Sequence, residues 1–79
     1  MKVLSKRTYE EVVISHDGTF LKEYPCYGVV FNSDGFVGGH VGWDEGLCQF
    51  VFRTDGSEVF SADCLLDIAD FLKLANAND

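Results

Sequence analysis

Turn signals recur along this 79-residue chain and constrain what it can fold into. An acidic residue precedes glycine in four short segments: His16-Asp17-Gly18, Ser33-Asp34-Gly35, Asp44-Glu45-Gly46 and Thr54-Asp55-Gly56. Aspartate accepts hydrogen bonds from the backbone of a turn, and glycine adopts a positive φ at no steric cost. Strands that tight turns join are antiparallel neighbours, so this spacing predicts an antiparallel meander.

The segments between these turns are rich in β-branched and aromatic residues, a composition typical of strands. They predict strands at Tyr9–Ser15, Phe20–Tyr24, Tyr27–Asn32, Phe36–Trp43, Leu47–Arg53 and Glu58–Phe60. Pro25 is expected to end the second run, leaving an edge strand or a bend before the third. Alternation within the runs predicts inward-facing side chains at Val12, Ile14, Cys48, Phe50 and Phe52.

The last segment changes from the period of a strand to that of a helix. Ser61 is a good N-cap, and Asp63 falls in the first turn, where it meets the positive end of the helix dipole. Apolar residues then follow at steps of three and four: Cys64, Leu65, Ile68, Ala69, Phe71, Leu72 and Ala75. We expect a helix at Ala62–Ala75 on one face of the sheet, and a polar tail, 76–79, that frays.

These elements predict a single α+β domain with an antiparallel sheet of four to six strands and one C-terminal helix. Residues 1–7 form a basic arm, 8–60 the sheet and 61–75 the helix. The arm contains Lys2, Lys6 and Arg7, whereas from Thr8 onward three basic residues oppose thirteen acidic ones, a net charge of −10. Such a surface repels nucleic acid and anionic lipid and attracts basic protein surfaces.

No signal peptide or membrane span is apparent, and the three cysteines, Cys26, Cys48 and Cys64, form no C-x-x-C motif. We expect a reduced, cytoplasmic protein whose cysteines are small buried hydrophobes. His16 and His40 lack the spacing of metal ligands or of a Cys–His catalytic pair. The sequence therefore predicts no cofactor, no metal and no enzymatic activity.

The helix carries a row of carboxylates, because Asp63, Asp67 and Asp70 recur at i, i+4 and i+7. Like charges at this spacing destabilise a helix slightly, so stability alone does not favour the row. With Leu66 and Leu74 at its margins, the row suits a basic protein groove. The alternative is an ordinary solvated face.

Two further segments have both a functional and a structural interpretation. Trp43, Asp44 and Glu45 are predicted at a hairpin tip, where the indole is either an interface anchor with an acidic rim or a plug at one end of a small core. The glycine-rich run Phe36–Trp43 indicates a bulge or a close backbone approach, in which Gly38, His40 and Gly42 share a face. The structural interpretation is a bend that curls the sheet around the helix.

Taken as a profile, the chain resembles small phage-encoded inhibitors such as anti-CRISPR proteins. The short acidic body, the meander with Asp-Gly turns and the closing acidic helix, Asp63–Leu72, carry the resemblance. It implies an inhibitor that blocks a host nucleic-acid-binding complex by occupying the basic surface of that complex. No functional residue is carried over, because such inhibitors have diverse folds.

The leading hypothesis is thus a non-enzymatic module that binds a basic protein surface through Asp63, Asp67, Asp70, Trp43, Asp44 and Glu45. The alternative is a small structural or assembly protein, acting as a homodimer or virion component. In that case a strand edge, or the mixed sheet face with Val13 and Leu47, would pair with another copy.

Overall fold

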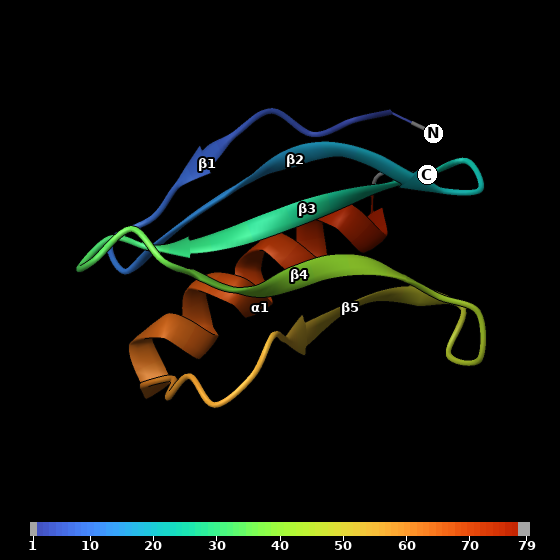
Figure 1. Cartoon of the computed structure of the whole chain (residues 1–79). Helices are drawn as coiled ribbons and strands as arrows, with labels where there is room; N and C mark the ends of the chain where they lie inside the picture. Colours follow the sequence, from blue (N-terminus) through green and yellow to red (C-terminus); the bar gives the residue numbers. More distant parts are fainter. Residues whose placement is uncertain (1, 78–79) are drawn as a thin grey trace.

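Five strands follow one another across an open antiparallel sheet in the computed structural model, which describes residues 2–77 (Figure 1). The elements are β1 (Arg7–Thr8), β2 (Val12–Leu21), β3 (Tyr24–Phe31), β4 (Val37–Asp44), β5 (Gln49–Thr54) and α1 (Ala62–Ala77). The strand order β1-β2-β3-β4-β5 and the C-terminal helix confirm the predicted α+β meander. Arg7, placed in the basic arm by the sequence, instead pairs with Ile14 as part of β1.

The core lies between α1 and one face of the sheet (Figure 1). Ser61 caps the helix as predicted, because the N–H of Cys64 donates to its Oγ at 3.2 Å. The buried hydrophobic residues come from β2 to β5 and from α1: Val12, Ile14, Tyr27, Val29, Val41, Phe50, Cys64, Ile68, Phe71 and Ala75. Leu65 and Ala69, expected on the same helix face, are exposed at its flank.

The end of α1 differs from the prediction. The helix includes Asn76 and Ala77, so it runs two residues beyond the expected end, while residues 78–79 of the expected tail lie outside the described part. The Asn76 amide accepts from the N–H of Phe50 at 2.7 Å and donates to its C=O at 3.2 Å. Asn76 therefore bonds to the backbone of β5 as a sixth strand would, which is why it does not belong to a fraying tail.

The predicted turn at His16-Asp17-Gly18 is wrong, because these residues lie within β2. The register between β2 and β3 shifts between His16 and Phe20, and Gly18 has φ +90°. A bulge and a tight turn both use an Asp-Gly pair in this way, so the sequence signal is the same. The chain reverses instead at Lys22-Glu23, where Lys22 has φ +58°, and Phe20–Tyr24 is not a separate strand.

Three other local expectations are also overturned. Pro25 lies inside β3 and does not bend the strand. The strand β4 pairs with β3 only from Tyr27 onward, so the N–H that proline lacks is not needed for a hydrogen bond between β3 and β4. Residues 58–60 are not a strand, and Phe60 instead packs its ring against Phe31 and Phe52. Cys48 is an exposed turn residue and not part of the core, whereas Cys64 is buried as predicted.

The glycine-rich strand contains the expected bulge. The register between β3 and β4 shifts at Val29/Val30, opposite Gly38 and Gly39. A side chain at Gly38 would meet the rings of Phe31 and Phe60, so Gly38 does not share the outer face with His40 and Gly42. The bulge and the close backbone approach that the sequence indicated therefore fall at the first two glycines of the run.

Candidate functional site

Three segments that are distant in the sequence meet at one end of the sheet: the β1–β2 connection, the β3–β4 turn and the first turns of α1 (Figure 1). Asn32, just after β3, ties the first two together, because its Nδ2 donates to the carbonyl oxygens of Tyr9 at 2.9 Å and Glu10 at 2.8 Å. The N–H of Asn32 also donates to the carbonyl oxygen of Glu11 at 3.0 Å. The connection that carries Glu10 and Glu11 is thereby held in place.

The helix carboxylates bond to this same connection. The N–H of Glu11 donates to Oδ2 of Asp67 at 3.0 Å across 56 residues of chain, and the hydroxyl of Tyr9 donates to Oδ2 of Asp70 at 2.7 Å. Hydrogen bonds to an ionised acceptor are stronger than neutral ones. Two of the three aspartates in the predicted row therefore also fasten α1 to the edge of the sheet.

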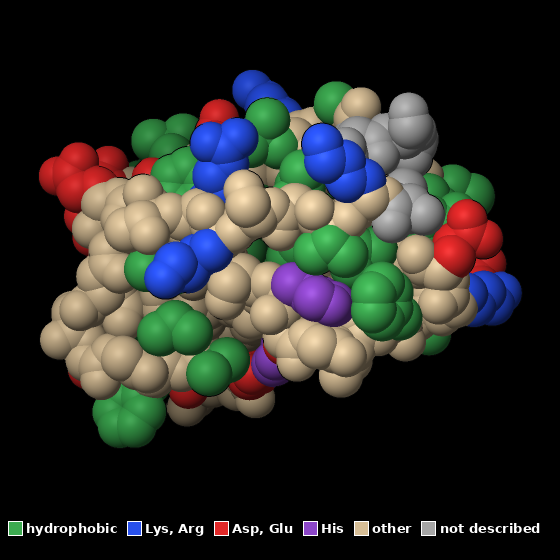
Figure 2. All heavy atoms as spheres, turned by 90° about the horizontal axis from the view of Figure 1, so that it is seen from above, with side chains coloured by type: hydrophobic (Ala, Val, Ile, Leu, Met, Phe, Trp, Pro, Cys, Tyr) green, Lys and Arg blue, Asp and Glu red, His purple; other side chains and the backbone are tan. Residues whose placement is uncertain are grey.

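A small hollow opens where these segments meet. It has a volume of about 160 Å³ and is lined by Glu10, Glu11, Asp63, Leu66 and Asp67, a set that we call the acidic end. Leu66 is 67% exposed there. Figure 2 shows acidic side chains gathered at the left of that view, the end at which Figure 1 places the β1–β2 connection and the start of α1.

The carboxylates of the acidic end have no cationic partner within the described chain. Among residues 2–77 the ion pairs join Lys22 to Glu45, His40 to Asp55 and Arg53 to Asp44, and none reaches this hollow. No described ion pair offsets the Coulomb repulsion between the grouped carboxylates, although Asp67 accepts a hydrogen bond from the Glu11 N–H. An incoming cation would gain from the uncompensated charge.

Asp70 points toward Tyr9 and away from the hollow. Burial, together with the hydrogen bond to Asp70, raises the pKa of Tyr9, and burial also raises the pKa of Tyr27. An unfolded tyrosine loses its proton near its ordinary pKa of 10.0, where both folded side chains still hold theirs. The unfolded state is then favoured as pH increases.

Below pH 10 we therefore expect the two tyrosines to add no pH dependence to the free energy of unfolding. Above pH 10 the free energy of unfolding should fall as the pH rises. Urea titrations between pH 8 and pH ~11.5 measure this dependence. A Tyr9→Phe variant should show a shallower decline than the wild-type protein. An equal decline in the two proteins would contradict the role assigned to Tyr9.

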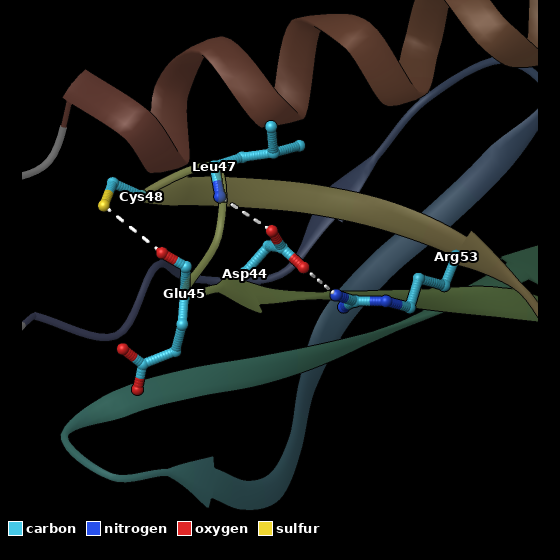
Figure 3. Close-up of polar contacts among 5 residues, drawn as sticks. All are labelled: Asp44, Glu45, Leu47, Cys48 and Arg53. Carbon is cyan, nitrogen blue, oxygen red and sulfur yellow. Dashed lines mark hydrogen bonds and ion pairs between the residues drawn. The ribbon is translucent and has the colours of Figure 1, made fainter.

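The other predicted group, Trp43, Asp44 and Glu45, lies at the β4–β5 turn, at the opposite end of the molecule (Figure 1). Asp44 accepts from the N–H of Leu47 at 2.8 Å and pairs with Arg53 through its other oxygen (Figure 3). Glu45 forms an ion pair with Lys22. Both charges are locally offset, unlike those of the acidic end.

Trp43 is half-buried and packs inward from the turn. Its ring stacks on Tyr24 with centroids 4.0 Å apart and 2° between the planes, and it meets the edge of Phe50 at 5.5 Å. This geometry fits a plug at one end of the core. Leu47 lies in the turn before β5 and is 62% exposed, so it is not part of the sheet face with Val13 that the homodimer hypothesis offered as one of its two pairing surfaces.

The six predicted residues thus fall into two separate groups, and Glu10 and Glu11, which complete the first, were not predicted. They are far from α1 in the sequence and approach it only through the folded sheet. Within residues 2–77, no three His, Cys, Asp or Glu side chains come together to hold a metal ion. No helix in that range has the length and apolar character needed to cross a bilayer.

Comparison of the chain with protein-family models, curated proteins and solved structures finds no match.

Proposed function

We propose that this protein is a non-catalytic binding module whose acidic end docks on a basic protein surface. A lysine or arginine side chain of the partner enters the hollow between the β1–β2 connection and α1, and the exposed Leu66 contacts the apolar stem of that side chain. The observation that carries the proposal is the convergence of four carboxylates without a described cationic partner.

The partner that we propose is a host nucleic-acid-binding complex, blocked in the manner of a phage-encoded, anti-CRISPR-type inhibitor. A protein surface that binds a phosphate backbone is rich in Lys and Arg. A rigid group of carboxylates on a domain of net charge −7 presents the same sign of charge and competes for that surface. The hydrogen bonds from Asn32 to the β1–β2 connection support this, because they reduce the ordering cost of binding.

The test removes charge from two of the three acidic side chains of the hollow, Glu10, Glu11 and Asp63, that make no described hydrogen bond. The double variant Glu10→Gln with Asp63→Asn should weaken binding about tenfold or more, which corresponds to about 1.4 kcal/mol. Its thermal midpoint should stay within a few degrees of the wild type. Affinity capture from the native host with both baits, followed by titration of the captured complex, provides the measurement, and added salt should weaken wild-type binding steeply.

The matched control changes the same charge at the opposite end of the molecule. Glu23→Gln with Glu45→Gln removes two carboxylates near the β2–β3 and β4–β5 turns, one of them in the predicted hairpin-tip group. We expect this variant to bind within about twofold of the wild type, because exposed ion pairs contribute little. Equal binding by the wild type and the Glu10/Asp63 variant would refute the assignment of the acidic end.

A further inference from the structure

The glycines of the sheet are of two kinds. A Cβ at Gly38 or Gly39 would overlap neighbouring atoms, so the fold itself requires glycine at both positions. A Cβ at Gly28 would meet nothing within 4 Å, and one at Gly42 would meet only Cys26 Sγ, at 3.8 Å. Neither of these two has a positive φ.

Neither packing nor backbone conformation therefore requires glycine at Gly28 or Gly42. Glycine inside a strand costs stability relative to a residue with a side chain. Its second common use in strands is to let a ligand or another chain approach the backbone closely. Both glycines lie on the face of the sheet that α1 does not cover, so a ligand or another chain would approach the backbone from that face.

A hollow of about 270 Å³ lies above Gly42 on that outer face. Its sides come from β2 to β5, with Leu21 and Cys26 as apolar side chains and Asp17, His40 and Arg53 as polar ones; we call it the glycine hollow. A side chain at Gly42 would occupy it, whereas Gly28 does not line it.

Two polar side chains of the glycine hollow have hydrogen-bond partners within the chain. Asp17 Oδ1 accepts from the N–H of Thr19 at 2.9 Å and from its hydroxyl at 2.6 Å, and His40 Nδ1 lies 2.9 Å from Asp55. Burial alone would raise the pKa of Asp17, but the hydrogen bonds from Thr19 and the nearby His40 and His16 together lower that pKa, so the carboxyl is ionised at neutral pH.

The ionisable side chains that line the hollow are Asp17, His40 and Arg53. At its rim Arg53 pairs with Asp44 and His40 with Asp55, so the Asp17 carboxylate is the lining charge that no described ion pair offsets. A cationic group complements this charge. Gly42 places no side chain in the hollow and Leu21 contributes an apolar one, and this lining favours a planar, weakly hydrated cation over a compact ammonium.

We infer that the glycine hollow binds the arginine side chain of a partner protein. The guanidinium lies over the backbone of Gly42, its methylene stem contacts Leu21, and its charged end faces Asp17. This second site is on the outer sheet face and is separate from the acidic end, so its existence does not depend on the function proposed above.

The test uses N-acetyl-arginine amide as a probe in an NMR titration of ¹⁵N-labelled protein. The amides of Thr19, Gly42 and Arg53 should shift, and saturation should require at least fivefold less probe than with N-acetyl-citrulline amide, which has the same shape without the charge. Gly42→Val should abolish these shifts without lowering the thermal midpoint, because valine is a good strand residue and its Cβ would meet only Cys26 Sγ, at 3.8 Å.

Two further variants make the result decisive. Gly28→Val places the same side chain on the same sheet face outside the glycine hollow, and its affinity for the probe should stay within about twofold of the wild type. Asp17→Asn keeps an oxygen for Thr19 but removes the charge, so it should weaken the probe at least threefold. The inference is overturned if the wild type does not bind the arginine probe, if citrulline binds equally well, or if Gly42→Val and Gly28→Val bind alike.

Discussion

Replacing Gly39 with alanine is expected to destabilise the fold by about 3 kcal/mol, at the upper end of the usual cost of overpacking. Gly39 pairs with Thr54 in the β4–β5 ladder. A Cβ at this position would overlap the carbonyl oxygen of Arg53 and lie 2.6 Å from the ring of Phe52. Since one of the two contacts is backbone, no change of rotamer relieves it, and β5 must move away from β4.

Urea denaturation of Gly39→Ala beside Gly28→Ala gives a matched comparison, because Gly28 sits on the neighbouring strand with no atom within 4 Å of an added Cβ. We expect Gly28→Ala to be neutral or to stabilise by up to about 1 kcal/mol. Similar unfolding midpoints for the two variants would show that the close approach of β5 to Gly39 is absent in solution.

Replacing Asn76 with alanine is expected to cost about 2 kcal/mol, because a buried backbone donor loses its partner. Phe50 is 3% exposed, and the Asn76 amide satisfies both its N–H and its C=O. The N–H and C=O of Phe50 that bond to Asn76 lie on the edge of β5 that pairs with no other strand of the sheet. Removing the amide therefore lowers stability and opens that edge to pairing with other chains.

Hydrogen exchange at the Phe50 amide separates this local effect from a general loss of stability. In Asn76→Ala the protection of the Phe50 amide should fall by more than the loss of global stability explains. The protection of the β3 amides should fall only by as much as that loss explains. Lys73→Ala, an exposed change one turn earlier in α1, should leave both quantities within about 0.5 kcal/mol. Unchanged protection of Phe50 in Asn76→Ala would rule out the proposed backbone contact.

The elements that were predicted correctly are those with a local signal. Ser61 and the 3- and 4-residue spacing of Cys64, Ile68 and Phe71 give the helix and its buried face directly. The Ser33-Asp34-Gly35 turn also follows the prediction, with φ +76° at Gly35 and the N–H of Phe36 donating to Asp34 Oδ1 at 3.0 Å.

The errors arise where one sequence signal serves two structures, or where the structure uses a residue that gives no signal. Asp17-Gly18 makes a bulge in place of a turn, while the actual reversal uses Lys22 at a positive φ, which few non-glycine residues adopt. Cys48 likewise takes φ +53° in the β4–β5 turn, although Gly46 was available two residues earlier.

The candidate site was only partly predictable because it is assembled by long-range contacts. The row of Asp63 and Asp67 follows from helical spacing, but its union with Glu10 and Glu11 depends on how α1 crosses the sheet. The distinction between glycines that the fold requires and glycines that it does not also needs coordinates. Gly39 and Gly42 look alike in the sequence and differ only in their neighbours.

The sequential order of the strands also has a consequence for biosynthesis. Each hairpin can close soon after its second strand leaves the ribosome, because β1 to β5 pair only with neighbours in the chain. The apolar face of the sheet nevertheless remains uncovered until α1, which follows all five strands, has been translated. A nascent chain stalled before Ala62 would leave that face uncovered, so the core can close only after α1 has been made.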